Sequence, residues 1–295
     1  MNKEKMLLFN NFLLEFSLDN SLLNWEIKRF LDEMINLSKM KKLHVTLIQK
    51  RIVWENPEQN IRDTTQIINT VGKTDLVVLP EMFVTGFTFR TALAETMQGR
   101  TVMWMKETAA AGGFALAGSL MIEENGLFYN RFLFVHPDGQ IDSYDKRHLF
   151  SFAGEDRFFE KGNARCVVNY RGWRILPFIC YDLRFPVWLR CRSDYDLLLC
   201  VANWPDSRIV AWDTLLKARA IENISYCVGV TITGTDGNGL EYSGHSAVFD
   251  YFGKKIAYAD AHEQVLQAAL SLTDLAEART RFPALSDTDD FTLNG

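Results

Sequence analysis

Residues 175–186 read Ile-Leu-Pro-Phe-Ile-Cys-Tyr-Asp-Leu-Arg-Phe-Pro, an apolar run that leads directly into a cysteine and then into charged residues. Two other segments follow the same pattern: residues 76–81 read Leu-Val-Val-Leu-Pro-Glu, and residues 144–150 read Tyr-Asp-Lys-Arg-His-Leu-Phe. Continuous apolar runs are typical of strands that are covered on both faces. Because ligands of open α/β sheets bind at the carboxyl ends of the strands, these segments predict an α/β fold with reactive side chains along one edge.

Outside these segments, strand and helix patterns alternate from residue 43 onward. The strand content is high and the helices are few, which predicts two sheets packed together with helices on the outside. Residues 127–135 and 140–144 form a predicted hairpin around Asp138 and Gly139. The other predicted strands are 43–48, 75–79, 114–122, 166–170, 174–180, 197–202, 226–233, 246–250, 255–259 and 264–270, and the predicted helices are 60–71, 101–111, 186–192, 209–224 and 273–279.

Residues 1–39 differ from the rest of the chain, so we expect an N-terminal extension at 1–39 and a single domain at 40–290. Apolar residues recur at helical spacing between Ile27 and Ile35, which is typical of an amphipathic helix. The segment is therefore either a docking helix or the product of a start codon assigned upstream of the real one. The second interpretation is favoured, because the ordered α/β pattern begins only at Leu43.

Composition excludes several classes of protein. The chain has 295 residues, with 32 Lys and Arg against 37 Asp and Glu, and its formal net charge is −5. Nucleic-acid binders usually carry a basic excess, so no nucleic-acid partner is expected. The N-terminus contains neither a signal-peptide core nor the roughly 18 apolar residues of a membrane span, which predicts a cytoplasmic protein without a membrane partner. The five cysteines include no C-x-x-C pair, so neither a disulfide framework nor a structural metal site is expected.

The reactive side chains in the three strand-end segments suit one kind of chemistry. The thiol of Cys180 becomes a good nucleophile only when a base removes its proton, and Glu81 is a candidate base. The oxyanion formed at an attacked carbonyl group would be stabilised by a cation such as Lys146 together with a backbone N–H. Taken singly, each residue has an ordinary structural interpretation, as a buried thiol, a solvated carboxylate or part of a surface charge cluster.

These motifs resemble those of the carbon–nitrogen hydrolase (nitrilase) superfamily, and the resemblance runs from about Leu43 to Pro283. It implies a four-layer α-β-β-α sandwich in which two mixed sheets are covered by helices. It also implies that Glu81 acts as general base and acid, Lys146 as oxyanion stabiliser and Cys180 as nucleophile, without a metal or organic cofactor. The backbone N–H of Tyr181 would complete the oxyanion site.

The same resemblance predicts a second active-site glutamate in the loop after the lysine. Glu155 fits this position better than Glu160, which lies too close to the next strand.

Within the superfamily the chain is most similar to the bacterial omega-amidases, which hydrolyse the distal amide of 2-oxo acids such as 2-oxoglutaramate. The resemblance therefore implies a small-molecule amide substrate and a homodimer. Other enzymes on the same scaffold remain alternatives, namely a nitrilase, a ureidopropionase-like amidohydrolase or a broad aliphatic amidase. A non-catalytic binding relative is a further alternative.

An omega-amidase must also hold the carboxylate at the far end of its substrate. The planar guanidinium of arginine binds a carboxylate through two parallel hydrogen bonds. Arg184 lies four residues after Cys180, where a turn would return it to the site. It is therefore predicted to bind substrate, and the alternative is a structural arginine paired with Asp182 or another carboxylate.

Overall fold

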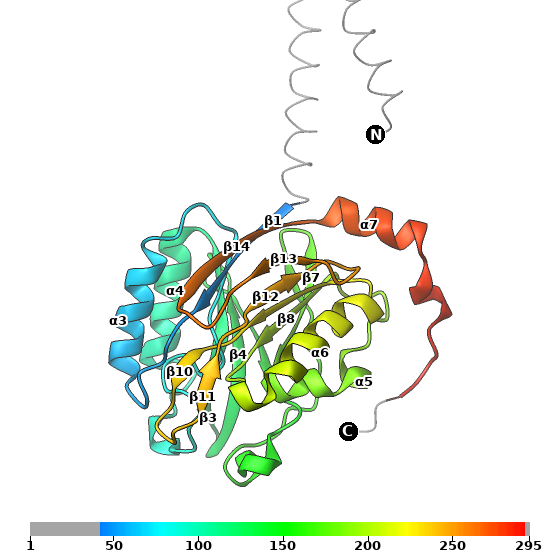
Figure 1. Ribbon diagram of the computed structural model, residues 1–295. Coiled ribbons are helices and arrows are strands. Elements are labelled where there is room, and N and C mark those ends of the chain that lie inside the picture. The colour runs from blue at the N-terminus through cyan, green and yellow to red at the C-terminus, as the bar shows by residue number, and fades with distance from the viewer. Residues whose placement is uncertain (1–41, 293–295) are drawn as a thin grey trace, which may run out of the picture. The chain divides into compact units, whose positions relative to one another are not determined.

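The structure, a computed structural model, describes residues 42–292 and places them in two six-stranded sheets with helices outside (Figure 1). The first sheet has the order β14-β1-β2-β3-β4-β5, with β1 (Lys42–Gln49), β2 (Leu76–Val78), β3 (Ala115–Glu124), β4 (Leu127–Val135), β5 (Ile141–Asp145) and β14 (Gln264–Ser271). The second has the order β13-β12-β9-β8-β7-β6, with β6 (Val168–Tyr170), β7 (Trp173–Ile179), β8 (Leu197–Val201), β9 (Tyr226–Val230), β12 (Ala247–Phe249) and β13 (Lys255–Tyr258). A separate hairpin pairs β10 (Thr233–Thr235) with β11 (Glu241–Ser243).

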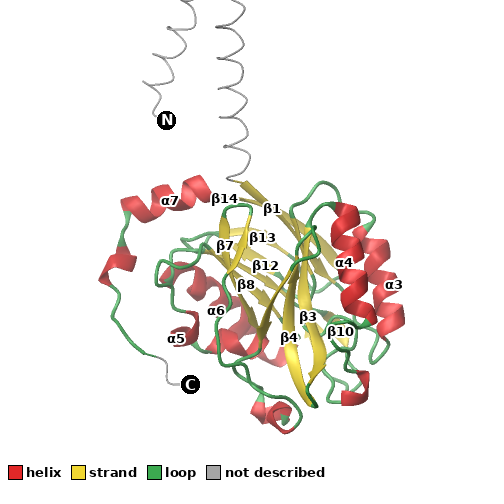
Figure 2. Ribbon diagram, turned by 180° about the vertical axis from the view of Figure 1, so that it is seen from behind, coloured by secondary structure: helices red, strands yellow, loops and turns green. Residues whose placement is uncertain are grey.

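Helices cover the outer faces of both sheets. Helices α3 (Pro57–Ile68) and α4 (Arg100–Gly112) lie against the first sheet, whereas α5 (Pro186–Leu189) and α6 (Ile209–Glu222) lie against the second (Figures 1 and 2). Helix α7 (Leu272–Arg281) follows β14. The layers therefore form the predicted α-β-β-α sandwich.

Strand β2 shows why the sequence contains continuous apolar runs. Leu76 and Val78 belong to the core that the two sheets share, whereas Val77 and Leu79 belong to the core between the first sheet and its helices. All four side chains are fully buried. Since both faces of the strand are covered, alternation of apolar and polar residues is absent.

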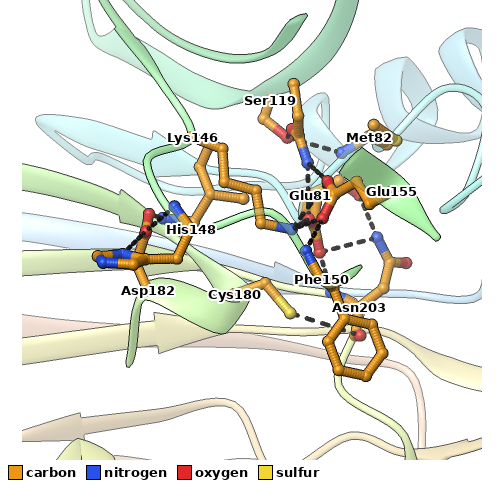
Figure 3. A network of polar contacts seen from close by, with 12 residues as sticks. Glu81, Met82, Ser119, Lys146, His148, Phe150, Glu155, Cys180, Asp182 and Asn203 are labelled. Carbon is orange, nitrogen blue, oxygen red and sulfur yellow. Dashed lines mark hydrogen bonds and ion pairs between the residues drawn. The ribbon is translucent and has the colours of Figure 1, made fainter. Parts of the chain in front are cut away.

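Parallel pairing brings the ends of several strands together. Strands β1, β2 and β3 pair in parallel, and so do β7, β8 and β9. Glu81 follows β2, Cys180 follows β7, and Lys146 follows β5 of the first sheet. Figure 3 shows that these three residues meet.

Most predicted elements are confirmed, but several boundaries differ. The helix predicted over 60–71 spans Pro57–Ile68, because Asn56 caps its N-terminus and Pro57 begins it. Three further differences have a clear structural reason. The strand predicted over 174–180 ends at Ile179, because Cys180 begins a short 3-10 helix over Cys180–Arg184. The strand predicted over 226–233 ends at Val230, since the chain then changes partners and Thr233 pairs with Arg51. The helix predicted over 186–192 ends at Leu189, after which the backbone of Arg190 is extended.

Two further predictions concern the N-terminal extension and membrane-spanning helices. The predicted extension over residues 1–39 lies outside the described residues. Within residues 42–292, no helix has the combined length and apolar character needed to cross a membrane.

Candidate active site

A cavity of about 530 Å³ opens at the carboxyl ends of the central strands. Cys180, Tyr181, Lys146 and Arg184 all line it. Its volume lies within the range of small-molecule sites, about 300–1,000 Å³. The described part of the chain therefore offers a binding site at the place that the strand-end motifs predict.

Glu81 is fully buried behind the cavity, at a sharp turn after β2. The next residue, Met82, has a positive φ of 43°, a conformation that non-glycine residues rarely adopt. The Glu81 carboxylate accepts hydrogen bonds from the side-chain amide of Asn130 (2.8 Å) and from the backbone N–H of Asn203 (2.8 Å). These bonds hold the carboxylate in one orientation.

Lys146 connects two carboxylates. Its Nζ lies 3.0 Å from Glu81 Oε1 and 2.9 Å from Glu155 Oε2, and all three side chains are fully buried (Figure 3). Burial alone would lower the pKa of Lys146, but the charges of Glu155 and Glu81 outweigh it and raise the pKa above its ordinary value. Lys146 is therefore a permanent ammonium beside the cavity.

Glu155 comes from the loop after Lys146 and folds back onto it. Its carboxylate accepts two hydrogen bonds from Lys146 Nζ and one from the backbone N–H of Phe150. Burial raises the pKa of Glu155, and the charge of Lys146 opposes this effect. Of the two glutamates considered from the sequence, Glu155 is buried in the cluster, whereas Glu160 is exposed.

Cys180 stands where β7 ends and the 3-10 helix begins. Its φ of 45° is positive, so the backbone is strained at this residue, as is common at functional sites. The thiol donates to the backbone carbonyl of Asn203 at 3.7 Å. Burial raises the pKa of Cys180 well above its ordinary value, the charge of Glu81 raises it further, and Lys146 lowers it. The resting group is therefore a thiol that needs a base.

Asp182 holds the turn after Cys180 in place. Its carboxylate accepts hydrogen bonds from the backbone N–H of Ile179 (3.0 Å), from the backbone N–H of His148 (2.9 Å) and from the hydroxyl of Tyr144 (2.8 Å). One buried carboxylate thus ties the turn that carries Cys180 to the segment that carries Lys146.

Tyr181 and Arg184 both face the cavity. Tyr181 lies in the first turn of the 3-10 helix, where backbone N–H groups lack partners within the helix. The Arg184 guanidinium lies over the ring of Trp204, 5.1 Å from its centroid. Asp182, the carboxylate considered as its structural partner, bonds instead to the groups described above.

Sequence reasoning missed two polar residues that orient the cluster. Asn130 donates to Glu81 and, at 3.3 Å, to Glu155, and its carbonyl oxygen accepts from the hydroxyl of Ser119. The signal was a single asparagine in the middle of the apolar strand β4. Asn203 follows the strand predicted over 197–202, and its side-chain amide donates to the backbone carbonyl of Glu81 at 2.8 Å. Among residues 42–292, no group of three or more His, Cys, Asp or Glu side chains is arranged to hold a metal ion.

The two sheets, the buried carboxylate–lysine cluster and the adjacent cysteine define the class of protein. The family model for carbon-nitrogen hydrolases matches residues 44–280, and the chain belongs to this family.

Individual relatives are similar over nearly their whole length. Omega-amidase YafV of Escherichia coli K12 is 46% identical over 255 residues, which are 86% of this chain and 100% of the relative. The 2-oxoglutaramate amidase of Bacillus subtilis is 31% identical over 253 residues, which are 83% of this chain and 97% of the relative. A carbon–nitrogen hydrolase superfamily protein from Xanthomonas campestris, whose crystal structure has an arsenic adduct in the active site, is 42% identical with a TM-score of 0.84. That match covers 86% of this chain and 99% of the other.

Proposed function

We propose that the protein is an omega-amidase that hydrolyses the distal amide of 2-oxo acid monoamides, converting 2-oxoglutaramate to 2-oxoglutarate and ammonia. The observation that carries the reaction type is Cys180, which opens into the cavity beside the buried cluster of Glu81, Lys146 and Glu155. The similarity to the omega-amidase of E. coli and to the 2-oxoglutaramate amidase of B. subtilis supports the substrate class.

In the first half of the reaction, Glu81 takes the proton of the Cys180 thiol while the sulfur attacks the amide carbon. A carbon–sulfur bond forms, and the carbonyl oxygen becomes an oxyanion that Lys146 Nζ and the backbone N–H of Tyr181 stabilise. Glu81 then gives its proton to the nitrogen, the carbon–nitrogen bond breaks and ammonia leaves. The product of this half is a thioester on Cys180.

The second half repeats these steps with water. Glu81 takes a proton from the water molecule, whose oxygen attacks the thioester carbon. The carbon–sulfur bond breaks, the thiol regains its proton and the acid product leaves. Glu155 acts as a positioning residue, since it holds Lys146 through two hydrogen bonds. No residue in this scheme requires a metal or organic cofactor.

Intact-mass measurement during slow turnover tests the covalent step. We expect an acyl adduct on Cys180, and we expect Cys180→Ala to abolish both the adduct and ammonia release. Cys166→Ala is the matched control, because Cys166 is only partly buried and does not line the cavity. Amidase activity that survives Cys180→Ala would refute the mechanism.

A panel of amides, nitriles and carbamoyl compounds tests the substrate class. The proposal expects 2-oxoglutaramate to give the highest kcat/KM for ammonia release. A preference for nitriles or carbamoyl compounds would identify another carbon–nitrogen hydrolase. No turnover at all, together with a Cys180 thiol inert to iodoacetamide, would identify a non-catalytic binding relative.

We further propose that the protein works as a cytoplasmic homodimer. The five cysteines are all free, which suits a reducing compartment. The homodimer follows from the resemblance to the superfamily, and size-exclusion chromatography with light scattering should give twice the chain mass of 33.9 kDa. A strictly monomeric peak would contradict it.

A further inference from the structure

The cavity contains two arginines whose charges no described residue neutralises. Arg184 and Arg208 both line it, and neither guanidinium donates a hydrogen bond or forms an ion pair with any group in residues 42–292. Most other arginines of this part of the chain, such as Arg131 and Arg174, pair with carboxylates. Two half-buried cations that line one cavity without a partner are unfavourable unless an anion joins them.

Aromatic rings fix the position of both guanidinium groups. Arg184 lies over the ring of Trp204, and Arg208 lies over the ring of Phe150, 5.2 Å from its centroid. The indole N–H of Trp204 also donates to the backbone carbonyl of Arg208 at 2.8 Å. Trp204 therefore supports both arginines, one through its ring and the other through its N–H.

Phe150 connects this pair to the reaction centre. Its backbone N–H donates to Glu155, and its ring packs against Tyr181 with the ring centroids 5.0 Å apart. The position of Arg208 is thus coupled to two residues that border the reacting groups. Lys146, the third cation of the cavity, is already paired with two carboxylates.

Two acidic residues line the same cavity, and both already have partners. Glu55 accepts hydrogen bonds from Thr88 and from Arg90. Asp236 accepts from the hydroxyl of Tyr242 and from two backbone N–H groups of its own hairpin loop. Neither carboxylate contacts Arg184 or Arg208.

We propose that Arg208 is a substrate-binding residue that, together with Arg184, holds the carboxylate of the substrate between two guanidinium groups. This inference rests on the proposed function. A carboxylate has about four lone-pair positions, so it can accept hydrogen bonds from both guanidinium groups at once. Arg208 thereby makes an anionic end group a requirement for efficient turnover.

The same pair of cations discriminates against an ammonium group beside the carboxylate. Glutamine has the distal amide and carboxylate of 2-oxoglutaramate, but it carries an ammonium where the 2-oxo acid has a ketone. Two unneutralised guanidinium groups repel that ammonium, whereas they attract the ketone oxygen. Arg208 therefore favours 2-oxo acid amides over 2-amino acid amides.

The test compares anionic and neutral amides on Arg208→Met. We expect kcat/KM for 2-oxoglutaramate and for succinamate to fall by about 10- to 100-fold, the effect of losing a charged hydrogen-bond partner. Activity on butyramide, an uncharged amide, should change by less than about threefold, since the chemical groups are untouched. The ratio of 2-oxoglutaramate to glutamine turnover should fall, because both substrates lose the same carboxylate contact while glutamine alone is relieved of the repulsion between Arg208 and its ammonium.

Three further variants separate binding from structure. Arg208→Lys should recover part of the loss on anionic amides, since it restores the charge without the planar fork. Arg192→Met is the matched control, because Arg192 also lies over an aromatic ring but does not line the cavity. The double variant Arg184→Met with Arg208→Met should lose less than the product of the two single losses, because the two arginines share one carboxylate.

Equal losses on butyramide and succinamate, or no loss on either, would overturn the role of Arg208. A wild-type enzyme that prefers succinamate to 2-oxoglutaramate would refute the proposed substrate, and the role of Arg208 would still be decided by the comparison of anionic and neutral amides. A wild-type enzyme that shows no preference for anionic amides would overturn both. If Arg208→Met lowers the melting temperature sharply, the same comparison on Arg208→Lys and Arg208→Gln decides the case.

Discussion

At the scale of single residues, Cys180 shows how backbone and electrostatics act together. Its positive φ turns the thiol out of strand β7 toward the cavity, while Asp182 holds the turn through its bond to Ile179. Burial and the charge of Glu81 raise the thiol pKa, so the nucleophile is protected as a thiol until Glu81 takes its proton. The turn thus presents the sulfur to the cavity, and the raised pKa keeps it protonated at rest.

The first prediction separates two effects of Glu81: its charge raises the pKa of the Cys180 thiol, and its carboxylate is proposed to transfer protons during turnover. Glu81→Gln removes one of the charges that raise the pKa of Cys180, while Lys146 continues to lower it. We therefore expect the thiol pKa to fall and alkylation by iodoacetamide at pH 7 to be at least as fast as in the wild type. Turnover should fall by about 100- to 10,000-fold, because no carboxyl group delivers a proton to the leaving ammonia.

Alkylation is followed by intact mass across pH and turnover by ammonia release, with Cys166 as the internal reference thiol. Slower alkylation of Glu81→Gln would contradict this account of the thiol pKa. Retained turnover would remove Glu81 from the chemistry.

Arg184 gives the second prediction. Loss of a hydrogen bond to a charged group costs about 2–3 kcal/mol, so Arg184→Met should lower kcat/KM for 2-oxoglutaramate by about 30- to 150-fold. Activity on an uncharged amide should fall far less, because in the proposed role Arg184 contacts only the carboxylate at the far end of the substrate. Steady-state kinetics on both substrates decide the matter. Equal losses, or a large drop in melting temperature, would assign Arg184 to the scaffold.

The sequence could predict residues that follow strands but not the residues that orient them. Cys180 and Glu81 end recognisable apolar runs, and the structure brings them together with Lys146. Arg208 has no comparable signal, because it becomes part of the cavity only through the turn after Trp204. Asn130 belongs to a strand whose neighbours across the sheet are known only after folding.

At the scale of elements, the boundary between β9 and β10 is set by strand pairing and not by the local sequence pattern. The apolar run from Tyr226 to Thr233 has the pattern of one strand, yet it contains β9 and the first residue of β10. Thr231 donates its backbone N–H to the hydroxyl of Ser246, and Thr233 donates its backbone N–H to the carbonyl of Lys50, which follows β1 of the other sheet. This change of partner depends on residues about 180 positions away along the chain, beyond the reach of local pattern.

Gly162 gives the element-scale prediction. A Cβ at this position would lie 2.1 Å from the backbone oxygen of Asp145, and the N–H of Gly162 donates to the carbonyl of Lys146. Gly162→Ala must therefore displace either its own loop or the end of β5, which directly precedes Lys146. We expect stability to fall by roughly 1–3 kcal/mol, and kcat/KM to fall by about 10- to 100-fold, as expected when a catalytic group is misplaced.

Chemical denaturation and amide kinetics measure the two effects. Gly72→Ala is the matched control, since a Cβ at Gly72 meets no atom within 4 Å. Wild-type kinetics in a folded Gly162→Ala variant would show that the end of β5 tolerates the displacement.

At the scale of the whole molecule, the sandwich separates its stabilising contacts from its reactive edge. The cavity opens where β2 and β7 end, whereas Asp75 lies at the opposite end of β2. At about 3.3 Å per residue, the six residue steps from Asp75 to Glu81 span at most about 20 Å. Substitutions at the edge that contains Asp75 should therefore change the stability of the protein without changing its catalytic activity.

Asp75 ties the two sheets together at that edge, and it provides the last prediction. Its carboxylate accepts hydrogen bonds from the backbone of His44 (2.8 Å) in β1 and from the guanidinium of Arg171 (2.6 Å), which follows β6 of the other sheet. Because Arg171 is 46% exposed, solvent screens part of the ion pair, and we expect Asp75→Ala to lower the free energy of unfolding by about 1–3 kcal/mol. Below the unfolding transition, kcat/KM should stay within about twofold of the wild type.

Asp138→Ala is the control for Asp75→Ala. The carboxylate of Asp138 bonds only within one exposed turn of the first sheet, so the loss of stability should stay at about 1 kcal/mol or less. Urea denaturation and kinetics at one temperature measure both quantities, and a loss of kcat/KM without a loss of stability would show that the two edges are coupled through the sandwich.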